Sequence, residues 1–288
     1  EPARLGAMRK ALAALAALLT VPGLAGAAEL ELTGFLGYTF PFYSQTFPYD
    51  SGPIDIPVPG LEIDQGGEFE LKASGGLVLG GGATVYASEG FGFELRLDSA
   101  DMAVDTLANT YTIRADLPPP DDPVTAELEL DKAKADLKAL TPWSFNLKLR
   151  SGGESLRLTA SGGLSRLGNV DFAIDQTVSL GVVEVNVETG ELDVATVQLR
   201  AASAVESESS WGGNLGLGIQ IGIGERGALI LEGRAFYFPK RTYLWERSTD
   251  EPLPPLQERL LERVLDRLDP VEFEPWWAQA TVGVAIRF

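Results

Sequence analysis

Charged side chains that alternate with apolar ones are the residues of this 288-residue chain that could do chemistry. Glu94 and Arg96, for example, alternate with Phe93 and Leu95. Both signs of charge occur, so an interior built from such positions would have to pair or hydrate them. The candidates to line such an interior are Glu94, Arg96, Arg114, Asp116, Lys148, Arg150, Arg157, Asp171, Asp175, Glu232, Arg234 and Arg287. They suit either a salt-bridged, hydrated interior or a selectivity lining for a polar solute.

The composition excludes most catalytic chemistry. The chain has no His and no Cys, which rules out Ser–His and Cys–His nucleophilic machinery and zinc sites built on those ligands. No phosphate loop, dinucleotide fingerprint, nucleophile elbow or calcium-loop spacing is present. We therefore expect a protein that is not an enzyme, with no cofactor and no metal site. The net charge of −18 also argues against nucleic acid as a partner, which requires a basic surface.

Alternation with a period of two residues predicts an all-β chain. In the segment 214–223, five aliphatic residues from Leu215 to Ile223 alternate with Asn214, Gln220 and glycines. Successive side chains of a strand point to opposite faces. One apolar face and one polar or small face is the pattern of a transmembrane β-strand, which meets lipid on one side and a lumen on the other.

The last strand carries a more specific signal. Its apolar face ends in four residues, with a terminal phenylalanine: Val282, Val284, Ile286 and Phe288. This segment resembles the C-terminal assembly signal of Gram-negative outer-membrane β-barrel proteins, although that signal often has an aromatic residue where Ile286 stands. The resemblance implies an antiparallel up-and-down transmembrane β-barrel, integral to the outer membrane, with both termini periplasmic. It also implies outer-membrane lipids, lipopolysaccharide and the barrel-assembly machinery as partners.

The number of strands depends on how two long segments are used. Counting every alternating segment favours twelve strands, with ten as one alternative. A second alternative is eight strands, which requires that 99–142 and 166–210 form β-hairpins standing above the membrane. Strands of about 9–11 residues are enough to cross a bilayer.

The N-terminal segment is typical of a secretory signal peptide. Arg9 and Lys10 precede an apolar run, 11–21, that is too short to span a bilayer, and the small residues 25–27 form a cleavage site. We expect 1–27 to be the signal peptide, with 1–7 as an extension upstream of Met8, and 28–288 to be the barrel. A membrane-anchor helix is the alternative.

Aromatic residues and one helix complete the expected architecture. Tryptophan and tyrosine favour the membrane interface, because their rings are apolar with a polar edge. Six are expected at the outer interface: Trp143, Trp211, Tyr243, Trp245, Trp276 and Trp277. The alternative places them in the core of a soluble β-sandwich. Leucines and a valine at helical spacing predict one amphipathic helix over 253–268, in the last outer connection, either packed on the barrel rim or serving as a plug, lid or partner-binding element.

These features favour a narrow passive channel, or porin, for small solutes. A closed structural or surface-interaction barrel, with adhesion carried by its outer loops, is the first alternative. A soluble periplasmic β-rich lipid-binding protein is the second.

Overall fold

The computed structural model describes residues 29–50, 62–116, 124–132, 134–137, 139–153, 155–168, 170, 172–185, 192–202, 209–248 and 252–288. The expected signal peptide, 1–27, lies outside these residues. The described part is almost entirely β-strand, with a single helix that is not long and apolar enough to cross a membrane.

Eight antiparallel strands close into a ring. They are β1 (Glu29–Pro41), β3 (Glu62–Ser88), β4 (Phe91–Asp116), β7 (Pro142–Gly152), β8 (Leu156–Leu167), β11 (Ser210–Ile223), β12 (Gly227–Tyr237) and β16 (Trp276–Arg287). Their order is β3-β1-β16-β12-β11-β8-β7-β4, and β4 pairs back with β3. The first and last ring strands close the barrel along eleven residue pairs, from Glu31↔Arg287 to Pro41↔Trp277. The predicted antiparallel β-barrel is therefore confirmed.

The ring has eight strands, so the favoured count of twelve is wrong and the alternative of eight is right. Within 99–142 and 166–210, the far half of β4 pairs with β5 (Val124–Glu129), and β9 (Phe172–Val185) pairs with β10 (Leu192–Ala202). These segments alternate as the ring strands do, but they pair with each other beyond the ring. Alternation reports which face a side chain occupies and not which strand is its neighbour.

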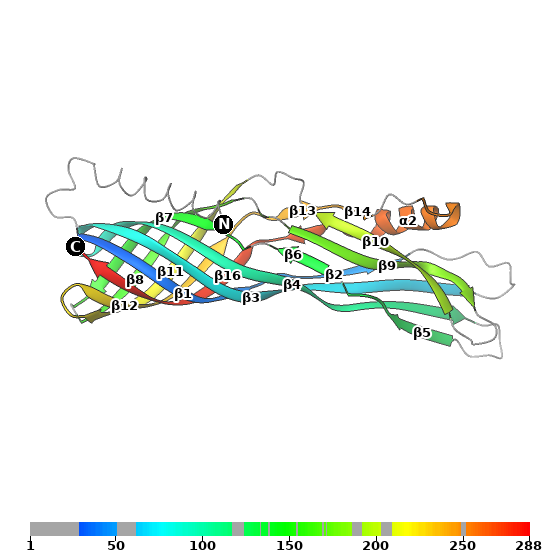
Figure 1. Ribbon diagram of the computed structural model, residues 1–288, viewed down its shortest axis with the longest axis horizontal. Coiled ribbons are helices and arrows are strands. Elements are labelled where there is room, and N and C mark those ends of the chain that lie inside the picture. Colours follow the sequence, from blue (N-terminus) through cyan, green and yellow to red (C-terminus); the bar gives the residue numbers. More distant parts are fainter. Residues whose placement is uncertain are drawn as a thin grey trace.

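A second β-structure, here called the outer unit, continues from one end of the barrel (Figure 1). It contains β2 (Ser44–Tyr49), the far halves of β3 and β4, and β5. It also contains a four-stranded sheet in which β6 (Lys134–Leu137) and β14 (Trp245–Arg247) flank β9 and β10. A short pair, β13 (Arg241–Tyr243) and β15 (Val271–Phe273), lies in the last connection.

The barrel buries polar side chains, whereas the outer unit buries apolar ones. In the ring, aliphatic side chains such as Leu215 and Leu217 are exposed on the outside, whereas Asn214 and Gln220 are buried inside. The outer unit instead has an apolar core, in which Phe47 stacks on Phe69 with a 4.8 Å centroid distance and Trp245 packs edge-on against both rings. The barrel thus has the lipid-facing pattern of a membrane protein, and the outer unit has the core of a water-exposed domain.

The predicted helix is confirmed, as α2 (Pro255–Arg267) in the connection between β12 and β16. Its buried residues Leu261 and Val264 belong to the apolar core of the outer unit. Arg267 at its end forms an ion pair of 2.7 Å with Asp50, which follows β2. The helix therefore packs on the outer unit and is not a plug in the barrel.

Two glycines mark the junction between barrel and outer unit. There β3 stops pairing with β1, at Leu77, and begins pairing with β2, at Lys72. A side chain at Gly75 would place its Cβ 1.9 Å from the Thr39 carbonyl oxygen. The Thr39 hydroxyl contacts the Gly76 carbonyl oxygen at 3.1 Å and the Gly76 amide at 2.9 Å. Only glycine permits this close approach of backbones.

Candidate functional site

Ten charged side chains form one continuous chain of ion pairs inside the barrel, which we call the ion chain. Acidic and basic groups alternate along it, and each contact is 3.5 Å or shorter. Its order is Asp98–Arg96–Glu232–Arg234–Glu94–Lys148–Glu31–Arg287–Glu29–Arg150. Five carboxylates and five cations cancel in charge, so the buried groups satisfy the requirement for pairing in a low-dielectric interior.

Two ion pairs of the chain cross the full width of the lumen. Arg234 and Glu232 are on β12, and Glu94 and Arg96 are on β4. In the ring order these strands lie four steps apart in either direction, so they are diametrically opposite. Arg234 Nη2 lies 3.0 Å from Glu94 Oε2, and Arg96 Nη1 contacts Glu232 Oε1. The middle of the lumen is therefore bridged twice.

Neutral polar side chains occupy the space around these bridges. Asn146 donates to Glu94 at 2.8 Å, and Gln220 donates to Glu31 at 3.0 Å. Gln279 donates to Asp98 at 2.8 Å. Each of these amides bonds a carboxylate oxygen that already accepts from a cation, so the neutral side chains add a second contact and help to hold the network in one arrangement.

An aromatic layer closes the lumen towards the outer unit. Trp277 is fully buried and stacks on Phe236, at 4.9 Å between centroids, and on Phe238, at 5.6 Å. These residues continue the inward-facing positions of β16 and β12, so the lining changes from charged to aromatic along the same strands. The Trp277 Nε1–H has no hydrogen-bond partner among the described residues.

The interior has little remaining space. The cavity between Phe35, Arg96, Lys148 and Glu232 has a volume of about 10 Å³, which is roughly enough for one water molecule. Arg96 lies over the Phe35 ring, 3.8 Å from its centroid. The two bridges and the aromatic layer thus cross the lumen at two levels among the described residues.

The structure places seven of the twelve expected lining residues in the ion chain: Glu94, Arg96, Lys148, Arg150, Glu232, Arg234 and Arg287. Arg157 lies at the start of β8, just after the turn that joins it to β7. It is half-buried and donates to the Gly153 carbonyl oxygen at 3.3 Å. Asp171 lies outside the described residues.

The other three do not line the lumen. Arg114 is exposed on the far half of β4, beyond the ring, and Asp116 ends the same strand opposite Glu62. Asp175 is on β9 in the outer unit, 3.8 Å from Arg200. These residues were misplaced because the far half of β4 and the whole of β9 alternate as ring segments do but belong to the outer unit.

Three members of the ion chain were missed by the sequence prediction: Glu29, Glu31 and Asp98. Each lies opposite the apolar face of its strand; Leu30 and Leu32, for example, face outward beside Glu29 and Glu31. Their alternation would have been enough to identify them.

Of the six expected interface aromatics, three are exposed on the barrel surface and three are buried. Trp143, Trp211 and Trp276 are exposed on the outer surface of the barrel. Trp143 and Trp211 meet edge-on at 5.4 Å, and Trp276 lies 5.2 Å from the ring of Phe42. Tyr243, Trp245 and Trp277 are buried, so their expected interface position is wrong. Trp276 and Trp277 are consecutive in one strand, so one of them must face inward.

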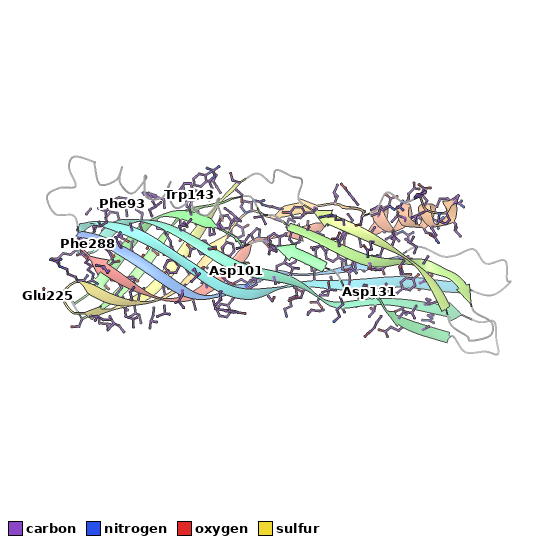
Figure 2. All side chains as sticks on the ribbon, in the orientation of Figure 1. Phe93, Asp101, Asp131, Trp143, Glu225 and Phe288 are labelled. Carbon is purple, nitrogen blue, oxygen red and sulfur yellow. The ribbon has the colours of Figure 1, made fainter. Side chains whose placement is uncertain are left out.

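The four residues of the expected assembly signal, Val282, Val284, Ile286 and Phe288, are all exposed on the outer face of β16. The Phe288 amide donates to the Leu30 carbonyl oxygen at 2.8 Å, and the Leu30 amide donates back at 3.2 Å. Phe288 and Glu225 lie at the end of the barrel away from the outer unit, which carries Asp131 (Figure 2).

No protein-family model and no curated protein matches the chain. Among solved structures, the outer membrane protein OprG from Pseudomonas aeruginosa is 12% identical, with a TM-score of 0.41 over 91% of this chain and 95% of that one. The β-domain of the Bordetella autotransporter BrkA is 12% identical, with a TM-score of 0.24 over 90% and 99%. The translocator domain of the autotransporter NalP from Neisseria meningitidis is also 12% identical, with a TM-score of 0.18 over 100% and 97%. At these values the fold assignment rests on the strand pairing described above.

Proposed function

We propose that this protein is a closed, non-enzymatic outer-membrane β-barrel that anchors the outer unit at the cell surface for interaction with other molecules. The observation that carries the proposal is the filled lumen, with its ion chain and its aromatic layer. A barrel of eight strands has an interior that its own side chains can fill.

The surface of the ring supports insertion into a bilayer. Its exposed aliphatic side chains would form a large sticky patch in water, but they match the hydrocarbon core of a membrane. Tight turns such as Gly224–Arg226 lie at the end with Phe288, and the long connections lie at the other end. Short periplasmic turns and longer outer loops are typical of outer-membrane barrels, which supports placing both termini in the periplasm.

The dimensions of the long strands support a role outside the membrane. β3 has 27 residues and β4 has 26, whereas about 9–11 residues are enough to cross a bilayer. In the ring, β3 pairs with β1 only over 77–86 and β4 pairs with β7 only over 91–97, so more than half of each strand lies in the outer unit. Its apolar core makes that unit a firm platform rather than a set of loose loops.

A narrow passive channel for small solutes is the second candidate. The polar lining of both charge signs favours it, since a water-filled pore would tolerate those residues. Conduction would require the contacts between β4 and β12 to separate. The soluble lipid-binding alternative is the least favoured, because the apolar surface of the ring faces outward and its interior is charged.

Single-channel recording in planar bilayers separates the two candidates. We expect no steady conductance from the wild-type protein. The charge-neutral variant Glu94→Ala/Arg96→Ala/Glu232→Ala/Arg234→Ala, combined with Trp277→Ala, removes both bridges and opens the aromatic layer, and it should produce measurable conductance. The matched control, Asp175→Ala/Arg200→Ala, removes an ion pair of the outer unit and should stay silent. Stable open channels in the wild-type protein would overturn the closed-anchor proposal and favour the channel.

A further inference from the structure

An arginine lies between two tryptophans on the outward surface of the barrel, close to the outer unit. Arg166 on β8 is the register partner of Trp143 on β7 and of Trp211 on β11. All three side chains are exposed. The Arg166 guanidinium carbon is 5.9 Å from the centroid of the Trp211 ring.

The Arg166 guanidinium is held in place by a serine hydroxyl. Its Nε and Nη2 donate to the Ser209 hydroxyl at 3.1 and 2.8 Å. No carboxylate lies within ion-pair distance of it among the described residues. Arginine has five N–H donors in a planar fork, and those of Nη1 donate to none of the described residues. In a chain with a net charge of −18, an exposed cation of this kind is a distinct feature.

The neighbouring surface has the composition of a membrane boundary. Leu164, two residues from Arg166 on the same face of β8, is exposed and lies on the aliphatic belt. On the other side, Arg241 Nη2 donates to Ser210 at 3.1 Å, so a second guanidinium is bound to the serine next to Ser209. Tryptophan rings favour the headgroup level, and arginine recognises phosphate through two parallel hydrogen bonds.

We propose that Arg166, with Trp143 and Trp211 beside it, binds the phosphate of a phosphorylated glycolipid in the outer leaflet. The guanidinium binds the phosphate, the two indole rings flank the sugar headgroup, and the acyl chains lie along Leu164 and its aliphatic neighbours. The proposal rests on the proposed function, because it requires the outer unit to face the cell exterior. The match of charge between this guanidinium and a phosphate monoester selects this lipid over a zwitterionic one.

Native mass spectrometry of the purified protein in detergent tests this proposal, with bis-phosphorylated lipid A as the added lipid. We expect the wild-type protein to retain lipid A and to retain the dephosphorylated form poorly. Loss of one charge-assisted phosphate contact should weaken binding about tenfold in Arg166→Gln. The control Arg259→Gln removes an exposed arginine of α2, which donates to the Pro255 carbonyl oxygen, and should bind lipid A as the wild-type protein does.

Equal retention by Arg166→Gln and the wild-type protein would overturn the proposal, as would equal retention of the dephosphorylated lipid. A separate measurement distinguishes this failure from failure of the proposed function. Insertion of the wild-type protein into phosphatidylcholine vesicles, followed by heat-modifiable migration on gels, tests the membrane barrel without lipid A. A barrel that inserts but shows no preference for the phosphate refutes only the glycolipid site.

Discussion

Arg234 on β12 and Glu94 on β4 join opposite walls of the barrel, with 3.0 Å between Nη2 and Oε2. Each residue also contacts a further member of the ion chain, Glu232 for Arg234 and Lys148 for Glu94. The lumen is thus crossed by side chains whose partners lie on the opposite wall of the ring. A pore of this sequence could open only by exchanging these ion pairs for water.

Removal of one partner of this bridge should destabilise the barrel strongly. Arg234→Ala leaves two carboxylates, Glu94 and Glu232, with fewer cations in a buried site. Breaking a buried ion pair in this way costs about 3–5 kcal/mol of the free energy of unfolding. Urea unfolding of the variant in lipid vesicles would measure this loss. In the control, Arg200→Ala breaks an exposed pair with Asp175 and should cost less than about 1 kcal/mol. Similar losses in the two variants would show that the lumen is hydrated and not buried.

Leu217 should respond to arginine as a lipid-facing residue does. It lies midway along β11 and its side chain is 65% exposed. Arginine at a bilayer midplane costs about 2–4 kcal/mol, so Leu217→Arg should lower the free energy of unfolding by that amount in vesicles. Leu107 on the far half of β4 is 50% exposed, and Leu107→Arg should change stability by only about 0.5 kcal/mol. The reverse order would mean that the aliphatic belt does not contact lipid.

Deletion of Phe288 should lower the yield of folded barrel in the outer membrane. Phe288 exchanges two backbone hydrogen bonds with Leu30 where the first and last strands close the ring, and the deletion removes both bonds together with the terminal aromatic side chain. The fraction of heat-modifiable protein in isolated outer membranes measures the effect. Phe145→Ala, which truncates another outward-facing ring on β7, serves as the control and should keep a higher yield. An undiminished yield after deletion of Phe288 would contradict its role in assembly.

Tyr49 should stabilise the outer unit by linking β2 to β9. Its buried hydroxyl accepts a hydrogen bond of 3.1 Å from the Ser179 amide, and burial raises the pKa of Tyr49 well above its usual value. Tyr49→Phe leaves that amide unsatisfied, which costs about 1–3 kcal/mol. Faster amide hydrogen exchange at Ser179 would report the loss. Tyr237→Phe changes an exposed tyrosine of the ring and should leave this exchange unaltered; unchanged exchange in Tyr49→Phe would refute the link.

The spacing of residues along the chain was enough to predict several features of this protein. Alternation assigned Glu94, Arg96 and Lys148 to the face opposite the aliphatic residues, and the structure places all three inside the barrel. The stripe of aliphatic residues at helical spacing located α2 within two residues at its start and one at its end. These features follow from the periodicities of strand and helix, which are properties of neighbouring residues.

The sequence by itself determined that the chain is a β-barrel, and which side chains of each ring strand face in or out. Only the tertiary structure decided that eight strands close the ring and that Arg96 meets Glu232. These last two residues are 136 positions apart, and their contact depends on which strands become opposite walls. The physical reason is that a strand's own alternation is local, whereas its hydrogen-bonded neighbours are chosen by closure of the whole sheet.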